Sequence, residues 1–168
     1  MGQDILNIFF ENPTEEFHIR GIAKELNIPK TTVGYHINHL LKESLIIKNT
    51  KGVFTSFRAN ESSEVYRFYK REEFLKKLME NNLLDYLEKE FNPKCIILFG
   101  SFAKAEYDKK SDIDLFIQAK ESKYNLEKYE KILKHKINLF FEPNLKSLSQ
   151  ELLNNIVNGI KLRGFIRL

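Results

Sequence analysis

GSFAKAEYDKKSDIDLFI, residues 100–117, is the stretch that decides the fold of the second half of this chain. It follows Cys95–Phe99, a short apolar run that is typical of a strand buried on both faces. A second strand is predicted over Ser111–Ile117. The sequence therefore predicts a glycine-serine turn, a short helix and a loop that together join two strands.

The residue types in this stretch suit a phosphate and metal site. Gly100 lets the backbone turn and lets a phosphate approach closely, and the hydroxyl of Ser101 can help the following N–H groups to hold that anion. Asp112 and Asp114 are two residues apart in the predicted strand, so their carboxylates point to the same side. Paired carboxylates suit Mg²⁺ or Mn²⁺, which bridges protein oxygens to nucleotide phosphates. Either motif alone is common on solvated strands and turns, but their order places both in one site.

The segment resembles the minimal nucleotidyltransferases of the polymerase-beta-like superfamily, whose pattern is Gly-Ser, about ten residues, and then Asp-hydrophobic-Asp. The resemblance implies a mixed-sheet α/β fold over residues 92–168, with ATP or another nucleoside triphosphate as substrate or ligand. It also implies a role for each matching residue: phosphate binding by Gly100, Ser101 and Lys104, and metal ligation and catalysis by Asp112 and Asp114.

The chain departs from that family pattern at two positions. Ala105 stands where the family often has glycine. The family's third carboxylate, on a later strand, falls on Asn138 of the predicted strand Ile137–Phe141. An amide can coordinate a cation through its oxygen but cannot act as a base, and loss of a general base costs about 10² to 10⁴ in rate. Glu142 is the alternative carboxylate if this strand bulges or ends early.

The first 60 residues have helical periodicity followed by a predicted hairpin. Apolar residues at helical spacing predict three short helices, with turns at Asn12-Pro13 and Asn27–Pro29. Strands are predicted over Leu45–Lys48 and Val53–Arg58, with Gly52 at the hairpin tip. This half resembles a winged helix-turn-helix domain. The whole chain is therefore predicted to be α+β, with a winged helix over residues 1–60, a linking helix or helices over 61–91 and the nucleotidyltransferase-like domain over 92–168.

The winged-helix resemblance implies double-stranded DNA as a partner, and charge supports it. Residues 30–58 include five basic side chains and one acidic side chain. Their net charge of +4 equals that of the whole chain, as expected of a surface that binds phosphates. The alternative is that the winged helix binds a protein. The residues expected to contact DNA are Lys30, Thr31 and Thr32 at the phosphates, Tyr35 and His36 at base edges, and Lys51 at the wing tip.

The remaining features indicate a cytoplasmic protein, and a homodimer is expected because winged-helix regulators that read paired half-sites need two copies. No apolar run approaches the roughly 20 residues of a membrane span. The single cysteine, Cys95, falls in a predicted core strand, and an unpaired, buried cysteine fits a reducing compartment such as the cytoplasm. An apolar stripe from Val65 to Phe91 is expected to pack on the second domain or on a partner subunit, and Lys70–Glu73 is expected to be a solvated face. A surface helix is predicted over Glu121–His135.

Three functions fit these patterns. The preferred one is a DNA-binding regulator whose second domain binds a magnesium nucleotide and transfers a nucleotidyl group weakly. The second is an antitoxin-type enzyme that adenylylates a toxin-like partner protein. The third is a catalytically inactive nucleotidyltransferase scaffold.

Overall fold

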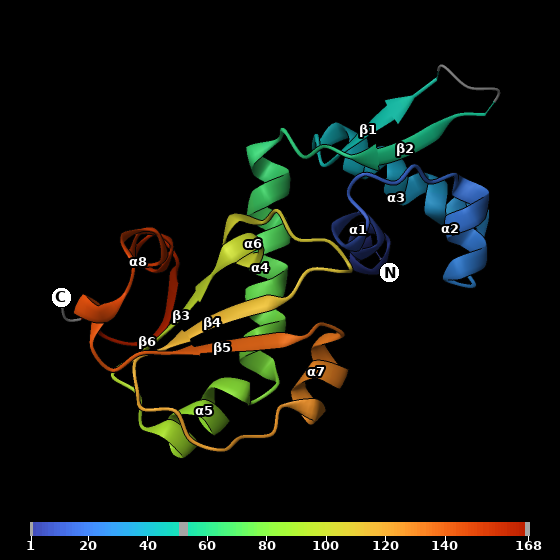
Figure 1. The fold of residues 1–168 in the computed structure, drawn as a ribbon. Helices are drawn as coiled ribbons and strands as arrows, with labels where there is room; N and C mark the ends of the chain where they lie inside the picture. The colour runs from blue at the N-terminus through green and yellow to red at the C-terminus, as the bar shows by residue number, and fades with distance from the viewer. Residues whose placement is uncertain (1, 51–53, 167–168) are drawn as a thin grey trace. The chain divides into compact units, whose positions relative to one another are not determined.

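The computed structural model describes residues 2–50 and 54–166, which divide into two compact units, Met1–Lys70 and Arg71–Leu168. The boundary between the first unit and the second unit falls inside one helix, α4 (Glu64–Glu80) (Figure 1). Among the described residues, no helix has both the length and the apolar composition needed to cross a membrane.

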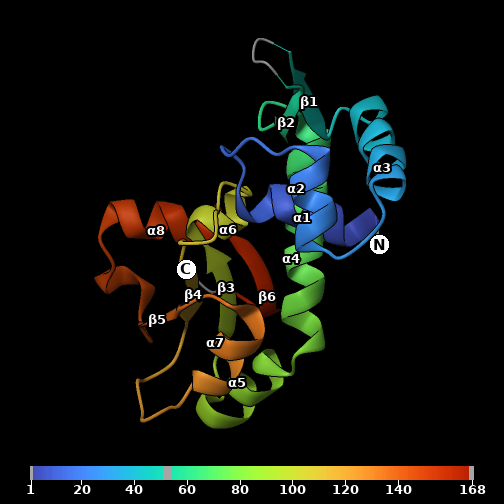
Figure 2. The same cartoon turned by 90° about the vertical axis from the view of Figure 1, so that its right-hand side faces the viewer.

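The first unit consists of three helices followed by a two-stranded antiparallel hairpin (Figure 2). Its elements are α1 (Gly2–Glu11), α2 (Ile19–Glu25), α3 (Lys30–Lys42), β1 (Ile46–Asn49) and β2 (Ser56–Ala59). Apolar residues from all of them, with Tyr66 of α4, form one buried cluster. The Tyr66 hydroxyl donates a hydrogen bond of 2.9 Å to the Phe9 carbonyl in this core. β1 is shifted by one residue from the predicted strand Leu45–Lys48, and β2 begins later than the predicted Val53–Arg58 and ends one residue beyond it. The predicted tip of the hairpin lies outside the described residues.

A tight turn joins α2 to α3. Asn27 adopts a left-handed conformation with φ 54°, and the Ile28 N–H donates back to the Ala23 carbonyl at 3.0 Å. This pattern ends a helix by satisfying its last carbonyls, and Asn tolerates the left-handed region better than most residues. Pro29 then precedes the first residue of α3. Phe17, in the connection between α1 and α2, pairs with Phe57 through a backbone bridge, a strand contact that the sequence did not reveal.

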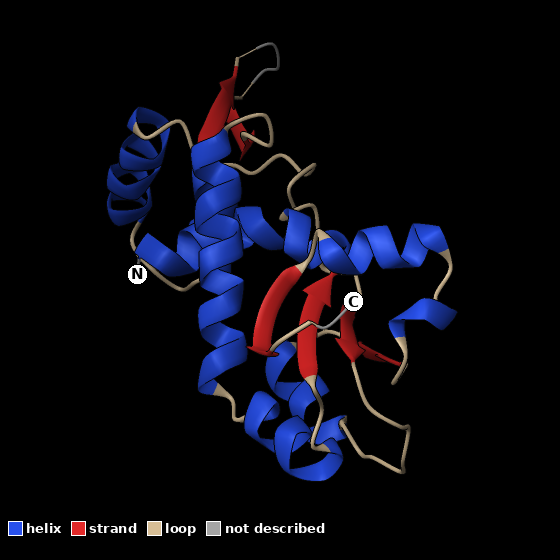
Figure 3. Cartoon of the chain, turned by 90° about the vertical axis from the view of Figure 1, so that its left-hand side faces the viewer, coloured by secondary structure: helices blue, strands red, loops and turns tan. Residues whose placement is uncertain are grey.

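The second unit is built on a four-stranded mixed sheet in the order β5-β4-β3-β6, drawn in red in Figure 3. Its strands are β3 (Cys95–Phe99), β4 (Ile113–Ile117), β5 (Ile137–Phe141) and β6 (Ile160–Gly164). The central strand β3 is antiparallel to both of its neighbours, whereas β4 and β5 are parallel and aligned without a register shift. The mixed sheet that the sequence predicted is therefore present.

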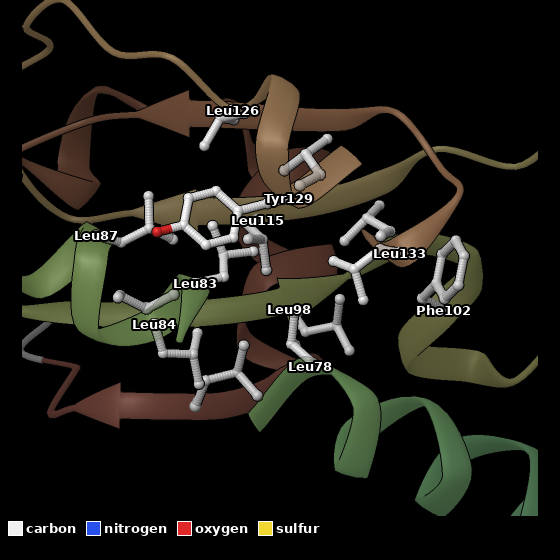
Figure 4. Packing of buried hydrophobic residues seen from close by; sticks show 14 of the residues in the cluster. Leu78, Leu83, Leu84, Leu87, Leu98, Phe102, Leu115, Leu126, Tyr129 and Leu133 are labelled. Atoms are coloured by element: carbon white, nitrogen blue, oxygen red, sulfur yellow. The ribbon is translucent and has the colours of Figure 1, made fainter. Parts of the chain in front are cut away.

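Helices cover both faces of this sheet (Figure 1). One face packs against the end of α4 and against α5 (Leu83–Phe91), α6 (Gly100–Lys104) and α7 (Glu127–Leu133). Figure 4 shows leucines of α5 and of the strands interlocking in this core. The opposite face packs against a short 3₁₀ helix, η1 (Leu145–Ser147), and against α8 (Gln150–Val157). Alternation along β3 and β4 sends their successive apolar side chains to these two cores in turn.

Several local expectations need correction. The linking segment needs none, since it is two helices, as the sequence allowed: Asn82 is left-handed and the Asn81 side chain accepts from the Leu83 N–H at 2.9 Å. Lys70 is buried, with its ammonium 5.7 Å from the centre of the Tyr66 ring, so the charged run is not a uniformly solvated face. Val65, Phe68 and Met79 of the predicted apolar stripe are instead about half exposed. The surface helix expected over residues 121–135 is shorter, because α7 begins at Glu127, and η1 was not predicted.

Candidate functional site

The turn after β3 is formed by Gly100, the first residue of α6. Gly100 has φ +70°, in the left-handed region that favours glycine. The five-residue helix α6 ends at Lys104 and is followed by Ala105, which is also left-handed at φ 58°. The Glu106 N–H donates to the Ser101 carbonyl at 2.8 Å. Ser101 is half-buried and Lys104 is exposed. The predicted Gly-Ser turn and short helix are therefore present, with the predicted phosphate-binding residues at their start and end.

Gly100 and Asp114 are packed directly against each other. Phe99 is opposite Asp114 in the antiparallel pairing of β3 with β4, so the turn begins beside that carboxylate. A Cβ atom at position 100 would overlap the Oδ2 atom of Asp114. The glycine is therefore required twice, once by its φ angle and once by the close approach of the backbone to the carboxylate. The Gly-Ser motif and the Asp-Ile-Asp motif form one structural unit.

The two aspartates and Asn138 meet at the same edge of the sheet. Asp114 is opposite Asn138 in the parallel pairing of β4 with β5. The Asn138 amide nitrogen lies 3.0 Å from Asp114 Oδ1 and 3.4 Å from Asp112 Oδ2, and donates to both. Asp112 precedes β4 rather than lying within it, and it is exposed, whereas Asp114 is half-buried. The three side chains form a small polar cluster open to solvent on one side.

The loop that leads into Asp112 is held by local hydrogen bonds. The Asp108 carboxylate accepts from the Lys110 N–H at 2.8 Å and from the Ser111 hydroxyl at 3.2 Å. The Lys110 N–H is the main reason that the pKa of Asp108 lies below its usual value. Buried His135 lies with Nδ1 2.8 Å from the Ser111 carbonyl, and it packs edge-on against Phe102. The backbone of residues 108–112 is thus fixed from two sides, and sequence spacing gave no sign of the His135 contact.

The donor set fits a hard divalent cation such as Mg²⁺, bound by two carboxylates and solvent. Asp112 and Asp114 would hold the ion, and the Asn138 amide oxygen could turn toward it because amide groups can flip. Within residues 2–50 and 54–166 no group of three or more His, Cys, Asp or Glu side chains is arranged to bind a metal. Glu142 does not complete the set, because β5 is aligned with β4 without a bulge and Glu142 Oε1 accepts from the Asn144 N–H at 2.9 Å.

The residues expected to contact DNA lie in the first unit. Lys30 and Thr31 are exposed at the start of α3, and Thr32 is half-buried. Tyr35 is 71% exposed, and its ring packs edge-on against His36, with the ring centres 5.4 Å apart. Lys51 lies outside the described residues. All five described residues belong to the first two turns of one helix.

Sequence reasoning also missed an aromatic residue beside the polar cluster. Phe140 follows Asn138 by two residues on β5, so it shares that residue's face of the sheet. The alternation along Ile137–Phe141 contains this signal, because it places Phe140 on the same face as Asn138.

Residues 81–162 match the family model described as "Polymerase beta, Nucleotidyltransferase". The matched segment runs from the residues just before α5 into β6, and includes the Gly-Ser turn, both aspartates and Asn138. No curated protein and no solved structure matches the chain. The family match supports a nucleotidyltransferase domain in this part of the chain, and it does not extend to the first unit.

Proposed function

We propose that the second unit binds a magnesium nucleotide through Asp112 and Asp114 and transfers its nucleotidyl group only weakly. The observation that carries this proposal is the Asn138 amide, which occupies the position opposite Asp114 and contacts both carboxylates. Gly100, held against Asp114, brings the backbone of the phosphate-binding turn to the same cluster. Two carboxylates beside an open glycine turn suit binding of a metal-bound phosphate.

Each residue has a distinct part in this proposal. The aspartates would orient the ion, Ser101 and the backbone after Gly100 would hold phosphate oxygens, and Lys104 would add positive charge. The bound Mg²⁺ would neutralise the phosphate charge that develops during transfer. Asn138 leaves the cluster without a third carboxylate, so the attacking hydroxyl would lack a nearby base. Binding and catalysis are therefore separable at this site.

The test is to titrate ATP in the presence and absence of Mg²⁺ by calorimetry. Binding should require Mg²⁺ and should be lost in Asp112→Ala and Asp114→Ala. Asp85→Ala is the matched control, since Asp85 is an exposed aspartate of the same unit that pairs with Arg163 at 3.4 Å. If both site variants still bound ATP without Mg²⁺, the two carboxylates would not be part of the ATP-binding site.

Catalysis is tested by Asn138→Asp with a labelled nucleotide and candidate acceptor proteins, a toxin-like partner included. Restoring the carboxylate should raise the transfer rate by about 10² to 10⁴. If the parent protein transfers no nucleotide, and the Asn138→Asp variant binds ATP but also transfers none, the missing-carboxylate explanation is wrong. The remaining function for the second unit would then be that of an inactive scaffold. A parent that already transfers nucleotide rapidly would contradict the weak-transfer proposal and favour the enzyme function.

DNA binding by the first unit is the second candidate function, and it is favoured by the exposed surface of α3. We propose that the first unit is a winged helix-turn-helix whose α3 enters the major groove, with Tyr35 toward base edges and Lys30 toward a phosphate. The exposed Lys48 and Arg58 of the hairpin add positive charge to the same unit. A homodimer would present two copies of α3 to paired half-sites.

Salt dependence of duplex binding tests this second proposal. The affinity for DNA should fall steeply as the salt concentration rises. Lys30→Ala should reduce the slope of log affinity against log salt concentration by about one, whatever the DNA sequence. Lys89→Ala is the control, because Lys89 is an exposed lysine of α5 in the second unit. An affinity that is independent of salt would contradict phosphate contact.

A further inference from the structure

The face of the sheet that bears Asp114 is polar at one end and apolar along the rest of its length. On this face the polar cluster lies at one end, the rings of Phe99 and Phe116 follow it, and Ile97 and Cys95 of β3 continue the face away from the cluster. η1 and α8 pack on this face through Leu145 and Ile156. Phe99 and Phe116 belong to the same buried cluster, and Phe99 is opposite Asp114, so the covered core begins directly beside the polar cluster.

Phe140 is an aromatic residue of this face that is partly open to solvent. It is opposite Phe116 in the parallel pairing of β4 with β5, and Phe116 is fully buried, whereas Phe140 is 39% exposed. Its ring meets that of Phe99 nearly edge to face, with 5.2 Å between centres and 68° between planes. Phe99 thus supports Phe140 from one side while part of the Phe140 ring stays uncovered.

The position of Phe140 relative to the polar cluster is fixed by the strand. It is two residues beyond Asn138 on the same face, which separates their Cα atoms by about 6.5 Å. A pentose spans a similar distance between the first phosphate of a nucleotide and its base. A nucleotide with its phosphates at the aspartates can therefore place its base over the Phe140 ring.

We propose that Phe140 is the stacking surface for the base of the nucleotide bound by the second unit. This inference rests on the proposed function, because it needs phosphates held at Asp112 and Asp114. Stacking on an aromatic ring accepts any base, since every base has a π face. Phe140 therefore confers affinity for nucleotides over simple polyphosphates, with stronger binding of purines than of pyrimidines and no strict choice of base.

The test compares two ligands that share a polyphosphate and differ in the base: ATP and inorganic tripolyphosphate, each with Mg²⁺. Phe140→Ala should weaken ATP binding by roughly 5- to 100-fold and leave tripolyphosphate binding unchanged. Phe140→Leu keeps an apolar side chain against Phe99 without a ring, so it should show the same selective loss while preserving the packing.

Phe165 is the matched control. It is a 74% exposed phenylalanine of the same unit, and its N–H donates to the carbonyl of Lys94 at the opposite end of β3 from Gly100. Phe165→Ala should change binding of neither ligand. Equal weakening of ATP and tripolyphosphate in Phe140→Leu would contradict a contact specific to the base.

A fluorescence experiment is possible because the chain contains no tryptophan. Phe140→Trp introduces a single indole whose emission should be quenched by ATP and not by tripolyphosphate, whereas the emission of Phe165→Trp should respond to neither. If Phe140→Ala binds ATP as well as the parent does, while Asp112→Ala and Asp114→Ala do not bind it, the stacking inference is wrong and the proposed function stands. If the parent binds no ATP with Mg²⁺, both are wrong.

Discussion

Left-handed residues lie at both ends of α6, and the chain fills one position with glycine and the other with alanine. Ala105 has φ 58°, which costs a residue with a Cβ atom about 1 kcal/mol relative to glycine. Ala105→Gly should therefore raise the free energy of unfolding of the second unit by up to about 1 kcal/mol in urea. Ala103→Gly, inside the same helix, should lower it by a similar amount. Destabilisation by Ala105→Gly would contradict a strain at this residue.

Gly100 is the reverse case. An alanine there would have an unfavourable φ of +70° and a Cβ atom that overlaps Asp114 Oδ2. Gly100→Ala should destabilise the second unit by about 1 to 3 kcal/mol and weaken binding of magnesium-ATP, because either the turn or the carboxylate must move. Urea unfolding and calorimetry measure the two effects. The control is Gly21→Ala, on α2 with open space around it, which should be neutral or stabilising. If Gly100→Ala left both the stability and the binding of magnesium-ATP unchanged, the close packing of Gly100 on Asp114 would be contradicted.

At the scale of elements, the sequence predicted types well and pairings poorly. Periodicity located β3, β4 and β5 and the short helix after Gly100, because buried strands and a glycine turn have strong local signals. The place of Asn138 beside the aspartates was expected only through the family resemblance, because its contact with both depends on the parallel register of β4 with β5, which is a long-range property. The burial of Lys70 and the strand contact of Phe17 were missed for the same reason.

Besides the backbone bridge between Phe17 and Phe57, a carboxylate of the preceding chain, that of Glu16, holds the hairpin of the first unit. Glu16 accepts from the Ser56 hydroxyl at 2.6 Å and from the Asn49 amide at 2.8 Å, and these bonds, that of Ser56 first, lower its pKa. A lowered pKa stabilises the folded state above the ordinary glutamate value, and this contribution is lost as pH falls through the folded-state pKa. The melting temperature of the first unit should therefore drop on acidification below about pH 4.3.

Glu16→Gln isolates this contribution. The amide cannot lose a charge, so the variant should show a smaller fall in melting temperature over the same acidic range, followed by circular dichroism. Glu25→Gln, at an exposed glutamate of α2, is the control and should keep the parental profile. Identical pH profiles for Glu16→Gln and the parent would show that the two hydrogen bonds do not contribute to acid stability.

At the scale of the whole chain, α4 supplies residues to two separate cores. Its Tyr66 belongs to the core of the first unit, whereas Phe74 and Leu78 belong to the core of the second unit. Leu78 is fully buried, so Leu78→Ala should destabilise the second unit by about 2 to 5 kcal/mol. Ile37→Ala, at an equally buried position of α3, should destabilise the first unit by a similar amount.

Hydrogen exchange followed by mass spectrometry can separate the two effects. Leu78→Ala should speed exchange in β3, β4 and α5 and leave α1 and α3 protected, while Ile37→Ala should do the reverse. Only α4 should lose protection in both variants, because its backbone belongs to both units. Loss of protection in α3 caused by Leu78→Ala would show that the two cores unfold as one cooperative body. The helix would then couple any ligand-induced stabilisation of the second unit to the first, since a ligand that binds only the folded state stabilises every segment that unfolds with it.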